Sequence, residues 1–396
     1  QAEDGIRDCL LSRGLGDVYK RQLSHISVKK SVTRPLGWPK KKVSLDLDIS
    51  CIINSQFLYR IIKKNIFRAQ KICDAAGVAN RPHIKTHKSP LLAKMQIDAG
   101  ARGITCQKLG EAEVMAEAGI DDILIATNIL GAARSGRLAS LQKKLPLKVC
   151  ADNHVSLQEY SKAAEAANRP LDVLIECDTG QKRAGVEDPK EAANLVQSII
   201  EDKWLKFTGL LYYPTLQGWD DTQMFHNSLT KMLDDLKVKA KIISTGGTPN
   251  FANIGKLEGA TEHRAGTCIF NDMMMVQDGF AKLADCGFRV FTSVVSRANE
   301  NRGILDAGSK TLTSDTGGLK GFGHINEYPE ASIIKFSEEH GFLDLGDCKM
   351  KPSVGDIVTV IPNHVCVAVN MVDELVMVQN NTILQTVPVT ARGMLV

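Results

Sequence analysis

The sequence predicts a (β/α)8 barrel of the TIM type followed by an antiparallel β domain. From about residue 57 to residue 280, short apolar runs alternate with helical patterns, and eight such runs are present. After about residue 280 the helical patterns stop, and short strand-like runs follow one another between Gly, Asn and Asp turns. Eight βα units favour a closed barrel over an open doubly wound sheet.

The barrel elements follow in chain order. An apolar stripe over 65–76 predicts a helix, and a further helix is predicted over 90–98, ended by Gly100. The segment 190–201 places its apolar residues on one helical face. The eight predicted barrel strands are 81–86, 103–107, 122–127, 147–151, 171–177, 206–213, 241–245 and 262–269.

The pattern after about residue 280 predicts strands only. We predict short strands at 290–295, 303–306, 332–336, 356–361, 366–370, 375–379 and 383–387. Residues 1–50 have no convincing period, and their first part resembles translated adapter sequence rather than a targeting peptide, since Asp4, Asp8 and Asp17 are unusual in transit peptides. We therefore expect a leader over 1–50, a barrel over 51–280 and a β domain over 281–396.

Composition excludes several classes of protein. An apolar fraction of 43% and a charged fraction of 24% are typical of soluble globular proteins. A net charge of +4 is too small to indicate nucleic-acid binding, and no apolar run reaches the length of a membrane helix. The ten cysteines are scattered without a CxxC pair, which is typical of a reducing compartment. We expect a cytoplasmic protein.

The stretch 81–88 is the first candidate for chemistry. On a strand, its period of two places His83, Lys85 and His87 on one face. Such a face suits an anionic, electrophilic ligand, and a partly desolvated lysine beside other cations becomes a nucleophile towards an aldehyde. An exposed basic edge strand is the alternative interpretation. Lys85 would lie at the C-terminal end of a barrel strand, where barrel enzymes carry their active sites.

Glycine turns follow the last two barrel strands. The turn 246–248 ends the seventh strand, where barrels commonly bind phosphate through backbone N–H groups. Gly266 and Thr267, after the eighth strand, offer a further amide and hydroxyl. Arg183, in the turn after the fifth strand, points to the same end of the barrel, although a surface ion pair would also explain it.

His364 and Cys366 form a second chemical feature. On a strand these two residues share a face, and imidazole with thiolate is a donor set that suits zinc. Two protein ligands leave open positions for water or substrate, as a catalytic ion requires. A buried cysteine beside a capping histidine is the alternative.

Taken together, these motifs resemble those of the D-threonine aldolase and D-serine dehydratase family, which belongs to the alanine-racemase-like, fold-type III pyridoxal-phosphate enzymes. The similar segments are 83–88, 178–185, 337–341 and 362–370, in the family's order. The resemblance covers about residues 57–393 and leaves the N-terminal segment out.

The resemblance assigns roles to individual residues. It implies that Lys85 is the catalytic lysine that forms the Schiff base with pyridoxal phosphate, that Arg183 contacts the phenolic oxygen and that Tyr213 lies near the pyridine ring. It implies a divalent metal ion (zinc, manganese or magnesium) on His364 and Cys366. The implied cofactor-binding residues are His83, Lys85, Gln107, Arg183, Tyr213, Gly246, Gly247, Thr248, Gly266 and Thr267.

Two departures from the family pattern bear on the reaction. Thr215 and Trp219 stand where the aldolases usually have a glycine and a histidine, so the usual base for the β-hydroxyl is missing. Cys268 stands where a tyrosine is usual.

The resemblance therefore implies a homodimeric lyase that depends on pyridoxal phosphate and a divalent metal. Its expected reaction is retro-aldol cleavage of D-β-hydroxy-α-amino acids to glycine and an aldehyde. The alternative is β-elimination, as in D-serine or D-threo-3-hydroxyaspartate dehydratases. A third interpretation is a non-catalytic pyridoxal-phosphate carrier, but such proteins resemble the barrel alone. No nucleic-acid or membrane partner is expected.

Overall fold

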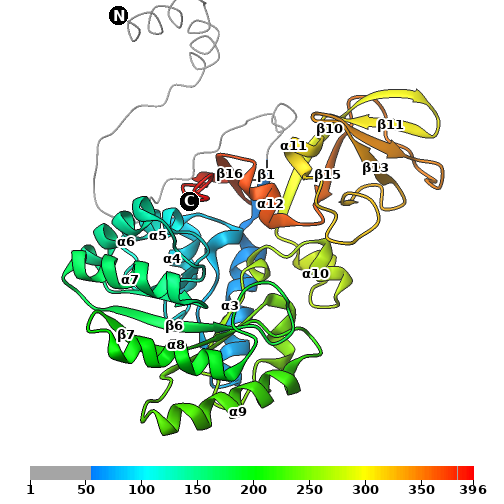
Figure 1. Ribbon diagram of the computed structural model, residues 1–396. Coiled ribbons are helices and arrows are strands. Elements are labelled where there is room, and N and C mark those ends of the chain that lie inside the picture. The colour runs from blue at the N-terminus through cyan, green and yellow to red at the C-terminus, as the bar shows by residue number, and fades with distance from the viewer. Residues whose placement is uncertain (1–54, 381) are drawn as a thin grey trace, which may run out of the picture. The chain divides into compact units, whose positions relative to one another are not determined.

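The computed structural model describes residues 55–380 and 382–396, so the leader predicted for residues 1–50 lies outside the described residues. Figure 1 shows two kinds of architecture along this chain: strands alternating with helices from blue to green, and strands with few helices from yellow to red. No helix in the described ranges is long and apolar enough to cross a membrane. The eight cysteines in these ranges are free, and seven of them are buried.

The first part is a barrel of parallel strands, as predicted. Eight strands pair in the order β2-β9-β8-β7-β6-β5-β4-β3. A parallel bridge between His83 and Thr105 joins the two ends, and Thr105 N donates to Pro82 O over 2.8 Å. The strands are β2 (Ala79–Asn80), β3 (Ile104–Cys106), β4 (Ile123–Ile125), β5 (Leu147–Ala151), β6 (Leu171–Cys177), β7 (Leu205–Tyr212), β8 (Ile242–Gly246) and β9 (Glu262–Arg264).

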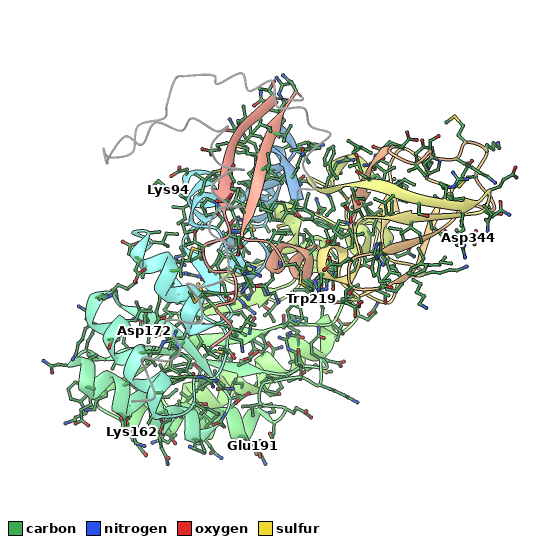
Figure 2. All side chains as sticks on the ribbon, turned by 90° about the horizontal axis from the view of Figure 1, so that it is seen from above. Lys94, Lys162, Asp172, Glu191, Trp219 and Asp344 are labelled. Atoms are coloured by element: carbon green, nitrogen blue, oxygen red, sulfur yellow. The ribbon has the colours of Figure 1, made fainter. Side chains whose placement is uncertain are left out.

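Helices alternate with the barrel strands, beginning with α3 before β2, and cover their outer side (Figure 1). Pro90 and Pro189 stand at the start of their helices, where the missing N–H costs no hydrogen bond. The charged side chains of Lys94, Lys162 and Glu191 are exposed on the outer faces (Figure 2). These helices are α3 (Tyr59–Ala75), α4 (Pro90–Asp98), α5 (Leu109–Glu117), α6 (Ala132–Lys144), α7 (His154–Ala167), α8 (Pro189–Glu201) and α9 (Trp219–Asp235).

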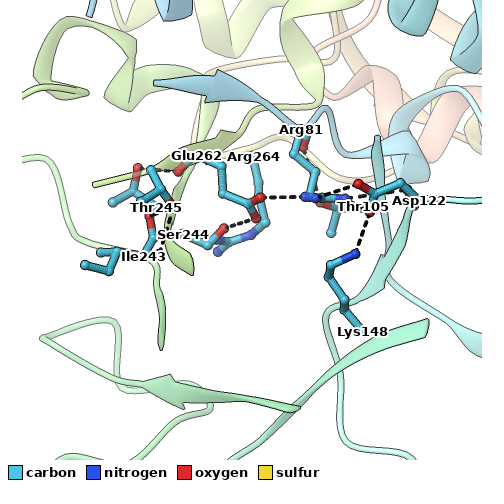
Figure 3. Close-up of polar contacts among 10 residues, drawn as sticks. Arg81, Thr105, Asp122, Lys148, Ile243, Ser244, Thr245, Glu262 and Arg264 are labelled. Atoms are coloured by element: carbon cyan, nitrogen blue, oxygen red, sulfur yellow. Dashed lines mark hydrogen bonds and ion pairs between the residues drawn. The ribbon is translucent and has the colours of Figure 1, made fainter. Parts of the chain in front are cut away.

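The barrel interior contains an ionic network, drawn in Figure 3. The side chain of Arg81 is 0% exposed, and its Nε donates to Glu262 Oε2 over 2.7 Å. Its Nη1 donates to Asp122 Oδ1 over 2.7 Å, and Lys148 Nζ donates to the same oxygen over 2.9 Å. Buried charges persist where they are paired in this way, and the network ties β9 to β5 through Asp122, which directly precedes β4.

The second part is a sheet of mainly antiparallel strands. Its path is β13-β14-β11-β10-β1-β16-β17, with β15 pairing β10 and β12. The strand β1 (Ser55–Leu58), which precedes the barrel, pairs antiparallel with β10 and parallel with β16. The predicted boundaries at residues 50 and 280 stay predictions. The remaining strands are β10 (Phe288–Asn299), β11 (Arg302–Leu305), β12 (His324–Ile325), β13 (Ser332–Phe336), β14 (Gly341–Asp344), β15 (Ile357–Ile361), β16 (Glu374–Gln379) and β17 (Thr382–Pro388).

The predicted strand 366–370 is wrong, because this segment is the helix α12 (Val365–Asn370). A second short helix, α11 (Ser309–Leu312), also follows residue 280, so helices do not stop there. A short apolar run does not by itself distinguish a strand from a helix. The buried carboxylate of Asp272 accepts a hydrogen bond from Val365 N over 3.0 Å, which satisfies a free N–H at the start of α12.

The predicted strand 81–86 is also wrong in most of its length. Strand β2 ends at Asn80, and Ile84–Thr86 forms a 3-10 turn. His87 is fully buried, and its Nε2 lies 3.1 Å from Gln96 Oε1. The prediction that His83, Lys85 and His87 share a face therefore fails for His87, because the alternation of a strand does not continue through the turn.

Candidate active site

A cavity of about 280 Å³ lies at the C-terminal ends of the barrel strands. Its lining includes residues that follow β2, β3, β6, β7, β8 and β9, together with His364 and Cys366 from the second part of the chain. Every site residue predicted from the sequence lines it except Gly246. The similar segment 337–341, between β13 and β14, does not contribute.

Lys85 lies in the 3-10 turn that follows β2, and His83 holds that turn. The backbone N–H of Lys85 donates to His83 Nδ1 over 3.4 Å. Gln107 Nε2 donates to Ala126 O over 2.8 Å, so its Oε1 faces His83 Nε2 at 3.1 Å. His83 therefore carries its proton on Nε2. Burial, then the charge of Lys85, lowers the pKa of His83 well below its usual value, so the ring is neutral.

A buried ion pair supports Gln107. Lys88 Nζ lies 2.9 Å from Glu111 Oε1, and both side chains are almost fully buried. The other oxygen of Glu111 accepts a hydrogen bond from Gln107 N over 2.6 Å. Lys88 is thus held in a structural ion pair. Of the two lysines Lys85 and Lys88, Lys85 is the one that faces the cavity.

The turns after β8 and β9 approach the cavity through their backbones. Gly247 has φ +101, and a Cβ there would lie 2.9 Å from the Tyr213 ring. A Cβ on Gly266 would lie 2.9 Å from His83 O. His263 Nε2 donates to Gly247 O over 3.0 Å while its Nδ1 lies 2.8 Å from Thr245 Oγ1. This support, with glycine at both places, fits a turn that binds a phosphate closely.

Arg183 is presented by a loop built around one carboxylate. Asp178 accepts hydrogen bonds from the backbone N–H groups of Gly180, Gln181 and Arg183 over 2.7–2.8 Å. Burial opposes ionisation of Asp178, but these bonds lower its pKa. The Arg183 guanidinium lies 5.0 Å from the centre of the Tyr213 ring, a cation–π arrangement that places both side chains at the cavity.

Three further charged residues of the cavity, Glu176, Arg264 and Asp278, are absent from the site predicted from the sequence. Arg264 is 6% exposed and donates to Ser244 Oγ over 2.6 Å and to Tyr212 O over 3.0 Å. Burial raises the pKa of Glu176, although the hydrogen bond from Cys150 and the charge of Arg264 act to lower it. An acid directly after an apolar run near the C-terminal end of a barrel strand, as at Glu176 after 173–175, is a sequence signal for an inward-facing functional position.

The proposed metal ligands come together in the cavity. His364 stands just before α12, and Cys366 lies in its first turn. A hydrogen bond with Cys366 raises the pKa of His364 to about 9, although burial acts to lower it. Asp315, whose Oδ2 lies 2.6 Å from His364 Nδ1, also raises this pKa. Burial opposes ionisation of Cys366, but His364 and Thr86 lower its pKa. Cys366 Sγ lies 3.1 Å from Thr86 Oγ1.

An imidazole and an ionisable thiol side by side form a donor set that fits a zinc-like ion. No group of three or more His, Cys, Asp or Glu side chains among the described residues is arranged to hold a metal. The prediction that His364 and Cys366 hold a metal ion therefore stays a prediction.

Trp219 has a structural position. Its side chain is 2% exposed and does not line the cavity, and its indole N–H donates to Asn250 Oδ1 over 3.1 Å (Figure 2 labels it). Asn250 in turn donates to Pro214 O and Gly246 O over 2.9 and 3.0 Å. Trp219 thus anchors the turn after β8, and the backbone N–H of Cys268 also contacts this turn by donating to Thr248 Oγ1 over 3.1 Å.

Comparison with known proteins identifies both parts of the chain. Residues 59–273 match the alanine racemase N-terminal domain, and residues 287–378 match the putative serine dehydratase domain. A D-threonine aldolase from Arthrobacter sp. is 31% identical over 83% of this chain and 89% of its own. A D-threo-3-hydroxyaspartate dehydratase from Delftia sp. is 28% identical over 77% and 88%.

A solved structure of a D-threonine aldolase from Filomicrobium marinum superposes with a TM-score of 0.81 at 27% identity. The match covers 88% of this chain and 98% of that one. Barrel and β sheet, in this order and over nearly the whole described length, are thus shared with these proteins. This chain belongs to the D-threonine aldolase and D-serine dehydratase family, whose barrel is of the alanine-racemase type.

Proposed function

We propose that this protein is a lyase that uses pyridoxal phosphate and a divalent metal to cleave D-β-hydroxy-α-amino acids into glycine and an aldehyde. The observation that supports this most is that Lys85, from the barrel, and the His364–Cys366 pair open into one cavity. A β-hydroxy amino acid has an amine that would lie at the Lys85 end of the cavity and a hydroxyl that would lie at the His364–Cys366 pair. The similarity to the Arthrobacter aldolase supports the same reaction.

The cavity fits pyridoxal phosphate in its chemistry. Lys85 would hold the aldehyde, Arg183 the phenolic oxygen, and the backbone of Gly247 and Gly266 with their neighbours Thr248 and Thr267 the phosphate. Each of these residues lines the cavity. The cofactor, when bound, supplies an electron sink for the electrons released at the substrate's Cα.

Lys85 is the residue suited to bind covalently and to move a proton. It is the single lysine that lines the cavity in the described part of the chain. His83 is neutral, and its Nε2 proton is engaged by Gln107, so it positions the turn of Lys85 rather than acting as a base. Lys85 is therefore the group that exchanges protons at the α-carbon.

The His364–Cys366 pair would hold the metal ion, for which zinc, manganese and magnesium are the candidates. A bound divalent cation lowers the pKa of a hydroxyl that it contacts. Trp219 replaces the usual histidine base and is buried away from the cavity, so activation of the β-hydroxyl depends on this pair.

β-Elimination is the second candidate reaction, and Cys366 favours it. Many aldolases of the family have an aspartate at this position, whereas a His-x-Cys pair resembles the zinc site of the dehydratases. The same cation would then assist departure of the hydroxyl group, and the products would be a keto acid and ammonia.

Product analysis with D-threonine tests the proposal. Acetaldehyde and glycine in equal amounts are the expected products, and 2-oxobutanoate with ammonia would replace the aldolase assignment with the dehydratase. Lys85→Ala should abolish either reaction. If protein that carries both cofactor and metal turns over neither D-threonine nor D-serine, the lyase proposal fails and a non-catalytic pyridoxal-phosphate carrier remains.

The remaining properties are also proposals. We expect a homodimer, measurable by sedimentation, and a cytoplasmic location, which is supported by the buried, unpaired cysteines of the described chain. The substrates are small D-amino acids.

A further inference from the structure

Thr86 connects the turn of Lys85 to the candidate metal pair. It is the last residue of the 3-10 turn Ile84–Thr86 and follows Lys85 directly in the chain. Its hydroxyl oxygen lies 3.1 Å from Cys366 Sγ, although the two residues are 280 positions apart. The barrel and the helix α12 therefore meet at this contact, one residue away from the lysine that faces the cavity.

The hydroxyl of Thr86 depends on this sulfur. The side chain of Thr86 is fully buried, and Cys366 Sγ is the sole hydrogen-bond partner of its hydroxyl within residues 55–380 and 382–396. A buried hydroxyl that lacks a partner costs about 1–3 kcal/mol, so the contact satisfies a group that would otherwise be destabilising. Thr267 Oγ1 lies 3.9 Å from the same sulfur, which is a longer and therefore weaker contact. Thr86 is thus the hydroxyl that fixes Cys366 Sγ.

The hydroxyl reaches the sulfur from the barrel side. Cys366 and Lys85 line the cavity, whereas Thr86 does not. The side of the sulfur away from Thr86 is therefore the side that faces the cavity, where a metal ion would bind. The Thr86 hydroxyl has little room to move, since a Cβ added to Gly266 would lie 2.9 Å from its oxygen.

Both proposed metal ligands are then held from behind by a polar partner. Asp315 Oδ2 lies 2.6 Å from the Nδ1 of the His364 imidazole, and the Thr86 hydroxyl lies behind the Cys366 sulfur. A metal-bound thiolate carries no proton, so the threonine hydroxyl would donate to it. Partners of this kind orient the ligands of a metal ion and tune their donor strength.

We propose that Thr86 is a positioning residue of the metal site, whose hydroxyl donates to Cys366 Sγ and holds the sulfur at a fixed place relative to Lys85. This inference rests on the proposed function, since it assumes that Cys366 binds the metal. Thr86 sets the spacing between the Lys85 end of the cavity, where the substrate's amine would lie, and the ion that would bind its hydroxyl. It does so without lining the cavity itself.

Metal selectivity tests the inference separately from turnover. Holoenzyme stripped of metal is titrated with zinc or with manganese by calorimetry, while the imine absorption reports the cofactor on Lys85. Thr86→Val removes the hydroxyl and keeps the branched shape of the side chain. We expect zinc affinity to fall about tenfold or more, because the sulfur loses the partner that orients it. Manganese affinity should change less than about threefold, because thiolate contributes more to binding of the softer ion. The imine absorption should stay unchanged.

Three further variants assign the effect to the hydroxyl. Thr86→Ser keeps the hydroxyl and should retain zinc affinity within about threefold. Thr86→Ala removes the same hydroxyl from a smaller side chain, so it should repeat the zinc loss even if valine does not fit beside the sulfur. Thr105→Val is the matched control, because Thr105 is fully buried, donates its hydroxyl to Arg81 O over 3.2 Å and does not line the cavity. It should alter neither metal affinity.

The outcomes distinguish this inference from the function on which it rests. Unchanged zinc affinity in Thr86→Val and Thr86→Ala overturns the positioning role while leaving the lyase intact. Equal losses for zinc and manganese also overturn it, because they would indicate a general loss of packing rather than the loss of the sulfur's partner. If the wild-type holoenzyme binds neither metal, the metal-dependent function fails, and the inference fails with it.

Discussion

His364 Nδ1 and Asp315 Oδ2 lie 2.6 Å apart, so the carboxylate fixes the tautomer and orientation of the imidazole. With Nδ1 donating to Asp315, the other ring nitrogen remains as the ligand atom, and a carboxylate behind a metal-bound histidine is a common arrangement. This contact joins the loop between α11 and β12, which contains Asp315, to the candidate metal site.

Removal of Asp315 is expected to weaken metal binding without affecting the cofactor. In Asp315→Ala the ring loses its orienting partner, and metal affinity should fall about 10- to 100-fold. Metal titration monitored by elemental analysis measures this, while visible absorption reports bound pyridoxal phosphate. Asp347→Ala, at an exposed position of the same sheet domain, is the control. Unchanged metal affinity in Asp315→Ala would contradict the role.

Chelation is expected to separate the metal from the cofactor. Two protein ligands bind an ion weakly, so a chelator should remove it while pyridoxal phosphate stays on Lys85. The stripped protein should lose β-hydroxyl chemistry but still bind D-amino acids. Cys366→Asp should shift preference from zinc towards manganese or magnesium, because carboxylate is the harder ligand. Full activity after exhaustive chelation, with no metal detected, would leave His364 and Cys366 as packing residues.

Reduction with borohydride is expected to label one lysine. Lys85 faces the cavity, whereas Lys88 is buried in its pair with Glu111 at 2.9 Å. Peptide mapping by mass spectrometry should therefore find the cofactor's mass on Lys85. Lys85→Ala should lose the cofactor's imine absorption and all turnover. A label on Lys88 would refute the assignment.

Trp219 is expected to matter for stability rather than for proton transfer. Trp219→Phe leaves Asn250 Oδ1 without its donor, so the free energy of unfolding should fall by about 2 kcal/mol. Turnover per bound cofactor should stay within about threefold of the wild type, since the indole lies outside the cavity. Trp204→Phe is a matched control, because the Trp204 indole N–H has no hydrogen-bond partner among the described residues. A loss of turnover of several hundredfold at full cofactor occupancy would make Trp219 catalytic.

Much of the barrel and of the site could be predicted from the sequence because each strand and helix of a barrel has a local pattern of apolar residues. The runs 147–151 and 171–177 match β5 and β6 in full, since parallel strands buried on both faces are short and mainly apolar. Residues that follow the C-terminal ends of the barrel strands lie at the same end of the barrel, whatever the conformation of their loops. Lys85 therefore reaches the cavity although it does not lie on the predicted strand, whereas Cys366 reaches the cavity from α12, outside the barrel.

The rest depended on contacts that are distant in sequence. The helix α12 begins where Asp272, 93 positions away, accepts the Val365 N–H. The strand β1 is defined by its pairing with β10 and β16, and no local signal shows that these two strands pair with it. Asp315 belongs to a glycine-rich loop whose relation to His364 is set by the fold alone.

His87 illustrates the same limit and leads to a prediction on pH. Its side chain is fully buried, and burial lowers its pKa to about 4, against hydrogen bonds with Gln96 and Ser89 N. In the unfolded chain a histidine has a pKa of about 6.5. Above that pH both states are neutral. As the pH falls below 6.5 the unfolded state takes up the proton first, so His87 makes the free energy of unfolding decrease until the pH reaches about 4.

The loss attributable to His87 between pH 7 and 4.5 is expected to be about 2 kcal/mol. His87→Gln should be less stable than the wild type at pH 7, because buried packing and hydrogen bonds change, but its stability should decline less steeply in acid by this amount. Urea unfolding at the two pH values measures the difference. His340→Gln, at an exposed position, should keep the wild-type dependence. Parallel pH profiles for the wild type and His87→Gln would mean that His87 takes up its proton equally in both states, and that its burial does not oppose charge.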